Sequence, residues 1–338
     1  MKLVPIIATA TLVAGSVVVA TAPASAALTL ICDGVAADIT VPGNLVVRAG
    51  EACTLSNVNV AGTTVVRRGA DLVVTGGTFS GSVTVRPDGY FDATDAMVEG
   101  RLHNTGYAVY AEGVHFGADV ITRPSSDLPP PYFFTLDTHV AGGVDSRGAE
   151  TMLDGTEVEG DVTGTDGGYT DLFDSVVGGG LSVSGMESGA AVCESEVYGD
   201  AVFSGNLFGV QLGTTGALAE CAGASFWGGD VAIDDNADGV EVSGNIVAGD
   251  LSGEGNDPAP VGEMNRVRGE VSGQFADLAA PALAADAVAP QARLLAPTGA
   301  PSTEGAQPEG TRQAQVGAKV QQRRAAATAE ATAAGKAF

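Results

Sequence analysis

The chain has few basic and few aromatic residues. Its 338 residues include 16 Lys and Arg against 41 Asp and Glu, which gives a formal net charge of −25 at pH 7, and aromatic side chains make up only 5%. No lysine occurs between residues 27 and 278. Nucleic acids and anionic membranes are bound through clustered lysines and arginines. The composition therefore argues against both as partners.

Long apolar runs are missing after the N-terminal segment. Residues 1–26 have a positive start, an apolar core and Ala24-Ser25-Ala26, a pattern typical of a secretory signal peptide that is cut after Ala26. A membrane anchor is the alternative for this segment. No later run reaches about 18 apolar residues, so we expect a secreted protein with no transmembrane segment after signal removal.

The other end of the chain lacks the Gly and Val pattern of the middle. Residues 279–338 are rich in Ala, Pro, Gln and Thr, a composition that predicts a flexible tail with a short helix near Arg323-Arg324. Within the tail, Leu295–Gly299 resembles a wall-sorting pentapeptide, but the hydrophobic span that such signals need does not follow.

Between the two ends, the element apolar-x-Gly-x-aliphatic recurs twelve times. Most copies follow one another at a nearly constant interval, and two intervals are longer than the rest. The position two before the glycine is large and apolar in all twelve copies and is Val in nine. The marker positions are Gly43, Gly62, Gly81, Gly100, Ala118, Gly142, Gly160, Gly179, Gly199, Gly229, Gly249 and Gly269.

This repeat predicts a stacked β fold. Alternating apolar residues indicate strands with one buried face, and a glycine between two inward positions indicates a close approach of backbones. A repeat of about 19 residues is too short for a strand-helix-strand unit. We therefore expect residues 27–278 to form a single right-handed parallel β-helix of about 12 rungs. A left-handed helix is the alternative, although that type keeps a strict hexapeptide period, whereas the period here drifts.

Two insertions interrupt the period. Pro124–Tyr132 contains three consecutive prolines, which cannot donate to a strand ladder, and Gly213–Ala224 includes Cys221. Both are expected to be loops, and their different offsets from the marker glycine predict that they leave the rungs at different corners. We expect the N-terminal disulfide region and Phe275–Ala289 to cover the two open ends of the rod.

Four cysteines in a secreted chain suggest two disulfides. Cys32 and Cys53 are about one rung apart, and Cys193 and Cys221 precede successive marker glycines. Pairing across one rung gives the Cα separation that a disulfide needs. We therefore predict Cys32–Cys53 and Cys193–Cys221, with free buried thiols as the alternative.

One segment matches the start of a calcium loop. Asp234, Asn236 and Asp238 precede Gly239 in the pattern D-x-N-x-D-G, but the closing Glu of an EF-hand is replaced by Asn245. The repeat offers another interpretation. Asn206 and Asn236 are separated by the same interval as the marker glycines Gly199 and Gly229, so they are expected to stack in equivalent turns. Apart from this possible calcium site, the sequence indicates no cofactor.

Half of the aromatic residues lie between Phe79 and Phe134, and the three histidines, His103, His115 and His139, are nearby. Aromatic rings supply rigid contact area for sugars or peptides. Tyr90, Tyr107, Tyr110 and Tyr132 are therefore candidate ligand-facing residues. The alternative is an aromatic stack in the interior of the rod.

No arrangement typical of a catalytic site stands out. Polysaccharide lyases and hydrolases need paired carboxylates, or carboxylate-bound calcium with a basic residue, in a cleft built by long loops. Here the rungs are minimal, and acidic residues such as Asp161, Asp166 and Asp171 are typical of a solvated face. No catalytic residue is assigned, and we do not expect an enzyme.

The last rungs resemble a known group of proteins. The residues that carry the resemblance are Ser243–Leu251, Gly255–Pro260, Asn265–Gly269 and Gly273–Phe275. They are similar to the final rungs of uncharacterised secreted Gly/Val-rich repeat proteins of high-GC Gram-positive bacteria. Those proteins carry cysteines where this chain has Gly253 and Phe275. The resemblance implies secretion and a β-helix, and it brings no established activity.

Together these features predict a secreted, acidic, non-catalytic β-helix that serves as a structural or interaction protein of the bacterial envelope or the extracellular medium. Its partner would be a cell-wall glycan or a protein surface, and the sequence does not indicate an oligomeric state. The alternative is a carbohydrate-binding or polysaccharide-cleaving β-helix that uses the aromatic segment.

Overall fold

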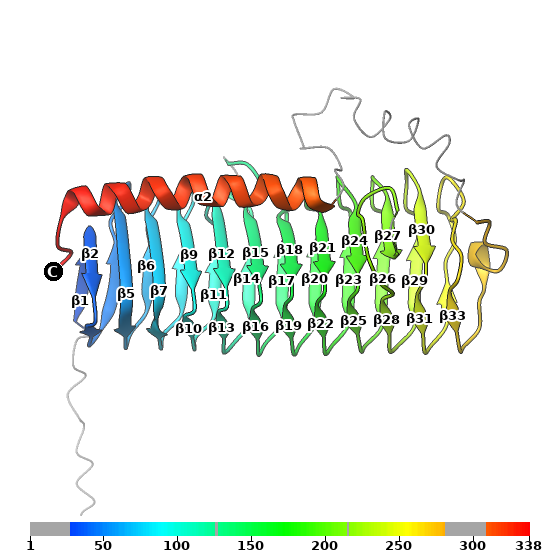
Figure 1. Ribbon diagram of the computed structural model, residues 1–338, viewed down its shortest axis with the longest axis horizontal. Helices are drawn as coiled ribbons and strands as arrows, with labels where there is room; N and C mark the ends of the chain where they lie inside the picture. Colours follow the sequence, from blue (N-terminus) through cyan, green and yellow to red (C-terminus); the bar gives the residue numbers. More distant parts are fainter. Residues whose placement is uncertain (1–27, 126–127, 215, 281–308) are drawn as a thin grey trace, which may run out of the picture.

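The computed structural model describes residues 28–125, 128–214, 216–280 and 309–338, with the side chains of residues 309–311, 313 and 314 left aside. The expected signal peptide at residues 1–26 lies outside these ranges. The described chain winds into a parallel β-solenoid of about 12 turns, with helix α2 (Glu309–Ala334) along one side (Figure 1). The prediction of a parallel β-helix of about 12 rungs is confirmed.

Each turn contributes up to three short strands, and equivalent strands of successive turns stack into columns. The first column is a 12-stranded sheet: β1 (Thr29–Cys32), β4 (Asn44–Val47), β6 (Thr64–Val66), β8 (Val83–Val85), β11 (Leu102–Asn104), β14 (Val120–Thr122), β17 (Val144–Arg147), β20 (Val162–Thr165), β23 (Leu181–Ser184), β26 (Ala201–Ser204), β29 (Val231–Asp234) and β32 (Leu251–Ser252).

The second and third columns share one 21-stranded sheet because β5 (Ala52–Val60) and β7 (Asp71–Phe79) run through both. The rest of the second column is β2 (Gly34–Ala37), β9 (Tyr90–Thr94), β12 (Ala108–Glu112), β15 (Tyr132–Leu136), β18 (Glu150–Asp154), β21 (Thr170–Phe173), β24 (Ala190–Cys193), β27 (Val210–Gly213) and β30 (Val240–Ser243). The rest of the third column is β3 (Thr40–Val41), β10 (Met97–Val98), β13 (His115–Phe116), β16 (His139–Val140), β19 (Glu157–Val158), β22 (Val176–Val177), β25 (Glu196–Val197), β28 (Phe226–Trp227), β31 (Ile246–Val247) and β33 (Arg266–Val267).

The alternating apolar residues fill the interior as the repeat predicts. In β8 and β11, for example, Val83, Val85 and Leu102 are fully buried. Phenylalanines also stack inside, with ring centroids of Phe79 and Phe91 6.2 Å apart. The marker glycines allow turns to approach closely, since a Cβ at Gly100 would lie 2.5 Å from the carbonyl carbon of Gly81.

A ladder of amides runs through the last turns of the solenoid. Nδ2 of Asn206 donates to Oδ1 of Asn236 at 2.7 Å, and Nδ2 of Asn236 donates to Oδ1 of Asn256 at 2.9 Å. Asn256 in turn donates to Oε1 of Gln274. The predicted stacking of Asn206 over Asn236 is confirmed, and these buried polar groups satisfy one another.

Both predicted disulfides are present, Cys32–Cys53 and Cys193–Cys221, with Cα separations of 5.6 and 5.4 Å. The two insertions emerge at different corners, as expected. The insertion between β14 and β15 leaves between the first and second columns, and the insertion between β27 and β28 leaves between the second and third.

The two ends of the solenoid are covered by different parts of the chain. At one end, the 3-10 helix η1 (Gly273–Phe275) places the fully buried ring of Phe275 on the last turns, whereas residues 281–289 of the expected cover lie outside the described residues. At the other end, the backbone N–H of Val35 donates to the carbonyl of Gly335, and the N–H of Ala337 donates to the carbonyl of Val35. The end of the described chain therefore pairs with β2.

The tail predicted over 279–338 contains a helix at Arg323-Arg324, as expected, but the helix is much longer than predicted and lies on the solenoid. Glu309–Ala334 form the 26-residue helix α2, which runs antiparallel to the progress of the solenoid, from β21 back to β2 (Figure 1). The helix forms because Ala, Gln, Arg and Lys are good helix formers, and it is fixed by packing against the second column. Residues 281–308 lie outside the described residues.

Candidate functional site

The four candidate tyrosines lie together on the outer surface of the second column. Tyr90 of β9 is in register with Ala108 of β12, which is in register with Tyr132 of β15. The rings of Tyr107 and Tyr132 are 5.5 Å apart between centroids. The aromatic residues of this segment thus divide into two sets: Phe79, Phe91, Phe116 and Phe133 fill the interior, and the tyrosines and Phe134 line an outer surface.

Carboxylates share this surface. Asp71 of β7, Asp92 of β9 and Asp171 of β21 project outward from the second column, yet they are 9%, 0% and 1% exposed. An isolated buried carboxylate is costly, so each of these groups needs a partner. We use the name covered face for the outward side chains of the second column from β5 to β27.

Helix α2 supplies the partners. Arg324 donates from Nε to Oδ2 of Asp92 at 2.8 Å and from Nη2 to Oδ1 at 2.6 Å. Arg323 binds both carboxylate oxygens of Asp71, with Nη2 2.7 Å from Oδ1. The buried guanidinium of Arg312 pairs with Asp171. Three arginines therefore neutralise three buried carboxylates, and Arg323 and Arg324 do so in the fork geometry that favours such pairs.

The same cations lie over the tyrosine rings. The guanidinium carbon of Arg323 is 5.3 Å from the ring centroid of Tyr107, and that of Arg324 is 5.3 Å from the ring centroid of Tyr110. Nζ of Lys319 is 5.5 Å from the ring centroid of Tyr132. Each of the four tyrosines is thus in contact with the helix, because Arg323 also lies 6.0 Å from the ring centroid of Tyr90.

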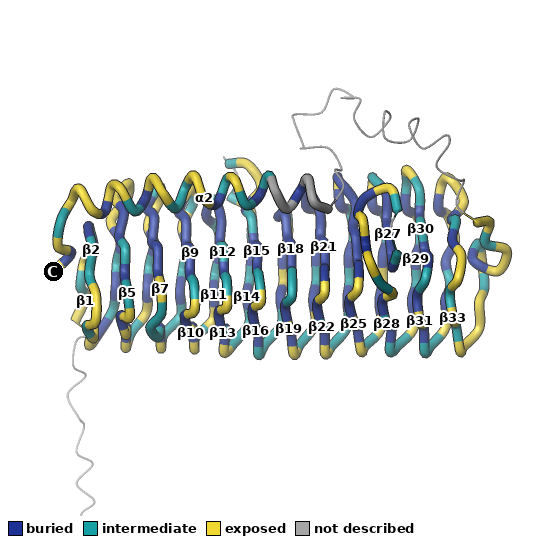
Figure 2. Tube along the Cα trace, in the orientation of Figure 1, coloured by how far each residue is buried: buried dark blue, intermediate teal, exposed yellow. Residues whose placement is uncertain are grey.

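Apolar contacts complete the interface. Val316 and Val320 pack with Phe134 and Met152, and Ala327 packs on Ala52 and Val73 further along the helix. A helix rises about 1.5 Å per residue and successive turns of the solenoid are about 4.8 Å apart. Residues three or four apart in α2 therefore meet successive turns, and Figure 2 shows the strands beneath α2 as largely buried.

Beyond the N-terminal end of α2, the second insertion covers the same face. Leu218, Ala219 and Cys221 are buried against Ala191 and Cys193. The side-chain oxygen of Gln211 accepts the backbone N–H groups of Leu218 and Ala219, and the Cys193–Cys221 disulfide anchors the loop. Helix and loop together cover the second column from β2 to β27.

Burial shifts the proton affinities of this face. It raises the pKa of the Asp71 and Asp171 carboxyls above their usual range, against the opposing effect of Arg323 and Arg312. Burial, together with the charge of Glu112, raises the pKa of Tyr110 to about 12. The hydroxyl of Tyr90 donates to Oδ2 of Asp92 at 2.5 Å, so it is already engaged within the interface.

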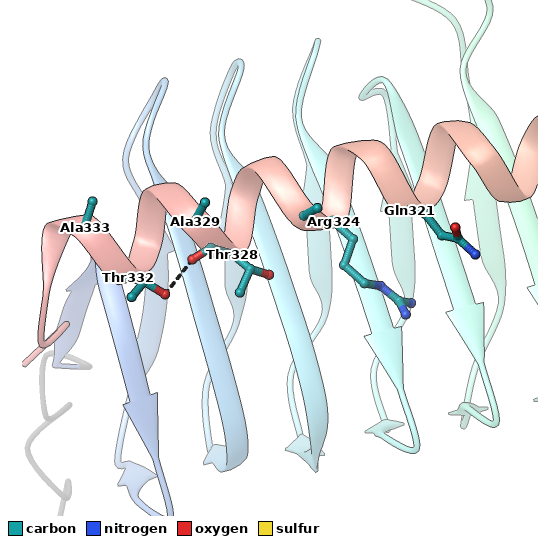
Figure 3. Close-up of a pocket in the computed structure, with 7 residues that line it drawn as sticks. Gln321, Arg324, Thr328, Ala329, Thr332 and Ala333 are labelled. Atoms are coloured by element: carbon teal, nitrogen blue, oxygen red, sulfur yellow. Dashed lines mark hydrogen bonds between the residues drawn. The ribbon is translucent and has the colours of Figure 1, made fainter.

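Little open space remains at the interface. A small cavity is enclosed between Tyr90, Tyr107, Phe134, Val316 and Lys319. A more open, shallow groove runs along α2 itself and is lined by Gln321, Arg324, Ala325, Thr328, Ala329, Thr332 and Ala333 (Figure 3). Its walls are mostly methyl groups, and the hydroxyl of Thr332 donates to the backbone carbonyl of Thr328 at 2.7 Å. This groove presents no pair of acids and no nucleophile.

The three candidate calcium ligands are not brought together. The side chain of Asn236 points into the solenoid, where its amide bonds Asn206, Asn256 and the carbonyl of Phe203. Oδ1 of Asp234 accepts the backbone N–H of Glu254, and Asp238 is exposed. In the described residues, no group of three His, Cys, Asp or Glu side chains could hold a metal ion. Calcium binding at this turn stays a prediction.

The histidines occupy two different columns. His115 and His139 stack on the outer surface of the third column, with Nδ1 atoms 2.8 Å apart and ring centroids 4.7 Å apart. Nε2 of His139 lies 3.2 Å from a carboxylate oxygen of Glu159. His103 projects from β11 in the first column, so the three rings form no joint site with the tyrosines.

Comparison of the chain with protein-family models, with curated proteins and with solved structures found no match. Among the helices of the described residues, none is both long enough and apolar enough to span a membrane.

Proposed function

We propose that this protein is a secreted, non-catalytic β-solenoid that acts as a structural or interaction element of the bacterial envelope or the extracellular medium. The observation that carries the proposal is the state of the covered face. Its aromatic rings and its acids, the residue types that a glycan-processing site would use, bind helix α2 of the same chain.

The buried carboxylates of the covered face support this proposal. General acid-base catalysis needs a carboxyl group within hydrogen-bond reach of the substrate. Asp71, Asp92 and Asp171 instead lie beneath α2 and are engaged by arginines. Paired in this way, they hold a helix in place, and the proposed function requires no cofactor.

Secretion is part of the proposal. It is supported by the signal-like residues 1–26 and by two disulfides, which form and persist in oxidising compartments. The resemblance to secreted Gly/Val-rich proteins of high-GC Gram-positive bacteria agrees with this location and stays a prediction.

The second candidate is a carbohydrate-binding or carbohydrate-cleaving β-solenoid. The cluster of Tyr90, Tyr107, Tyr110 and Tyr132 favours it, because stacked rings are a common platform for sugars. This function would require α2 to leave the face and expose the acids that it now neutralises.

One experiment separates the two functions. The full chain is screened against a glycan array and, in parallel, against acidic polysaccharides for release of reducing ends or unsaturated products. We expect no turnover of any polysaccharide. Turnover that is abolished by Asp92→Asn or Asp171→Asn, in variants that keep the wild-type circular dichroism, would contradict the proposal.

A further inference from the structure

The first column carries its charges in two separate halves. Strands β4, β6, β8, β11, β14 and β17, together with the residue on each side of them, contain six arginines and two aspartates. Strands β20, β23, β26, β29 and β32, counted in the same way, contain seven aspartates and no basic residue. Although the net charge of the protein is −25, the described first column is therefore basic from β4 to β17.

The arginines of this region are stacked by the strand register. Val47 of β4 pairs with Val66, and Val66 pairs with Val85. The next pairings join Val85 to Asn104, Asn104 to Thr122 and Thr122 to Ser146. The residues that follow these positions form a line along the corner: Arg48, Arg67, Arg86, Thr105, Arg123 and Arg147. We call its five arginines the arginine ladder.

The ladder has the spacing of the solenoid. Successive turns are about 4.8 Å apart, so the five steps from Arg48 to Arg147 span about 24 Å. Arg68 adds a second cation beside Arg67, and Arg101 lies on the opposite corner of the same sheet. The pKa of His103, between these corners, is lowered by partial burial and by the nearby charges of Arg101, Arg123 and Arg86.

Most of these cations have no structural role. Arg48 pairs with Asp33, and Arg123 pairs with Asp145, in contacts that are one-third to one-half exposed. Exposed pairs of this kind contribute little to stability. Within the described ranges, no carboxylate oxygen lies within 4.0 Å of Arg67, Arg68, Arg86 or Arg147.

The aspartates of the other half differ in this respect. Oδ1 of Asp161 accepts the backbone N–H of Gly180 at 2.8 Å, and Oδ1 of Asp230 accepts that of Asp250 at 2.8 Å. These carboxylates therefore hydrogen-bond one turn of the solenoid to the next. These aspartates join successive turns, as Arg123 does through the carbonyl of Asp145, whereas Arg67, Arg86 and Arg147 form no ion pair with a described residue.

We propose that the arginine ladder binds a linear anionic polysaccharide that lies along the solenoid axis. Guanidinium groups bind carboxylates and sulfates with paired hydrogen bonds, and a regular row of them matches a polymer with one acidic group per repeat. The inference rests on the proposed function, because it names the partner class of a non-catalytic interaction protein.

The surroundings of the ladder favour a glycan over other polyanions. The outward residues of the adjoining strands, Val65, Thr84, His103 and Ile121, offer a single ring, that of His103, whereas single-stranded nucleic acid is held by stacking of successive bases on several aromatic rings. A broad anionic surface such as a membrane would also meet the acidic half of the same sheet. A single polymer chain can follow a line of five arginines without touching that half.

The test uses the full chain and polygalacturonate, a linear uronic acid polymer, with neutral dextran and oligo(dT) as comparison probes. The variant Arg67→Gln/Arg86→Gln removes two members of the ladder. The matched control, Arg266→Gln/Arg268→Gln, removes the same charge from the far end of the third column. Binding is measured by calorimetry at several salt concentrations.

We expect binding to polygalacturonate, with an affinity that falls steeply with salt, and no binding to dextran. The ladder variant should bind about tenfold more weakly with a shallower salt dependence, and the control should change by less than about twofold. Because neither variant loses an ion pair, both should have the melting temperature of the wild type. Should the ladder variant fail to fold, Arg86→Gln/Arg147→Gln takes its place with the same expectation.

Three results would overturn the inference: no binding to polygalacturonate, equal losses in the ladder and control variants, or tighter binding of oligo(dT) than of the glycan. Absence of binding to polygalacturonate would not affect the proposed non-catalytic function. Cleavage of polygalacturonate would contradict the proposed function without contradicting binding at the ladder. The two failures are therefore distinguishable.

Discussion

The fully buried carboxylate of Asp92 in β9 is held by two hydrogen bonds from the guanidinium of Arg324 in helix α2, at 2.8 and 2.6 Å. The two residues are 232 positions apart in the chain. Their contact ties the end of the chain to the early turns of the solenoid.

Arg324→Gln should therefore weaken the fold. Removing one partner leaves a buried charge uncompensated, which costs about 3–5 kcal/mol for a fully buried pair. Arg324 is one-third exposed, so we expect a smaller loss of about 2 kcal/mol in the free energy of unfolding. Urea denaturation measures it.

A double variant provides the control for this pair. Arg324→Gln/Asp92→Asn leaves no buried charge, so it should be more stable than Arg324→Gln alone. Equal stability of Arg324→Gln and the wild type would show that α2 does not depend on this contact.

The docking of α2 was not predicted from the sequence, although a signal for it exists. Strand Ala190–Cys193 is continuously apolar, and Tyr132–Leu136 is apolar or aromatic except at Thr135, which is typical of strands buried on both faces. The Gly and Val repeat involves only their inward positions. The helix side is weakly patterned, because Ala327 and Ala331 bury little apolar area and four of its other contacts are three arginines and a lysine.

The Cys193–Cys221 disulfide should stabilise the cover of the last part of the second column. It closes a segment with a sequence separation of 28 residues. The chain-entropy model gives about 3–4 kcal/mol for a loop of this size. Cys193→Ser/Cys221→Ser should lower the free energy of unfolding by about that amount and expose residues 216–224 to protease before the strands. An unchanged cleavage pattern would contradict this role.

The amide ladder should be sensitive to a single change at its centre. Asn236→Ala removes the partner of both Asn206 and Asn256 and leaves buried amide groups unsatisfied. A loss of about 3 kcal/mol in the free energy of unfolding is expected. Ser182→Ala, on the outer surface of β23, is the control and should change the free energy of unfolding by less than about 0.5 kcal/mol.

Calorimetric titration of the wild type with calcium tests whether the turn at Asp234–Asp238 is a cation site.

The buried carboxyls should make stability rise as the pH falls from 7 to 5, against a smaller number of groups with the opposite effect: the lowered pKa of His103 makes the folded state bind fewer protons there. Burial raises the pKa of Asp71, Asp154 and Asp171 in the folded chain. In the range above the usual carboxyl pKa, the folded state therefore binds more protons than the unfolded state, and the free energy of unfolding decreases with increasing pH. The net charge of −25 acts in the same direction through self-repulsion. Thermal melts at pH 5, 6 and 7 measure the trend, and a lower melting temperature at pH 5 than at pH 7 would contradict it.

The positions of residues that repeat with the marker glycine could be predicted from the sequence. Contacts between parts of the chain that do not share this repeat, such as those of α2, could not be predicted as well. The stacking of turns and both disulfide pairs follow from the regular interval between marker glycines. Arg48, Arg67 and Arg86 recur at the same interval as Gly43, Gly62 and Gly81, so a part of the ladder could also have been found. The negative net charge gave no indication of the arginine ladder, because arginines that are far apart in the chain form a cluster only when the turns are stacked.

Hydrogen–deuterium exchange of the full chain reports whether residues 316–334 are held on the covered face. We expect their backbone amides to exchange slowly, with protection that falls in Arg324→Gln while β17 and β20 stay protected. Exchange of residues 316–334 at the rate of an unstructured peptide in the wild-type protein would contradict this expectation, since Tyr90, Tyr107, Tyr110 and Tyr132 would then be free to bind a ligand.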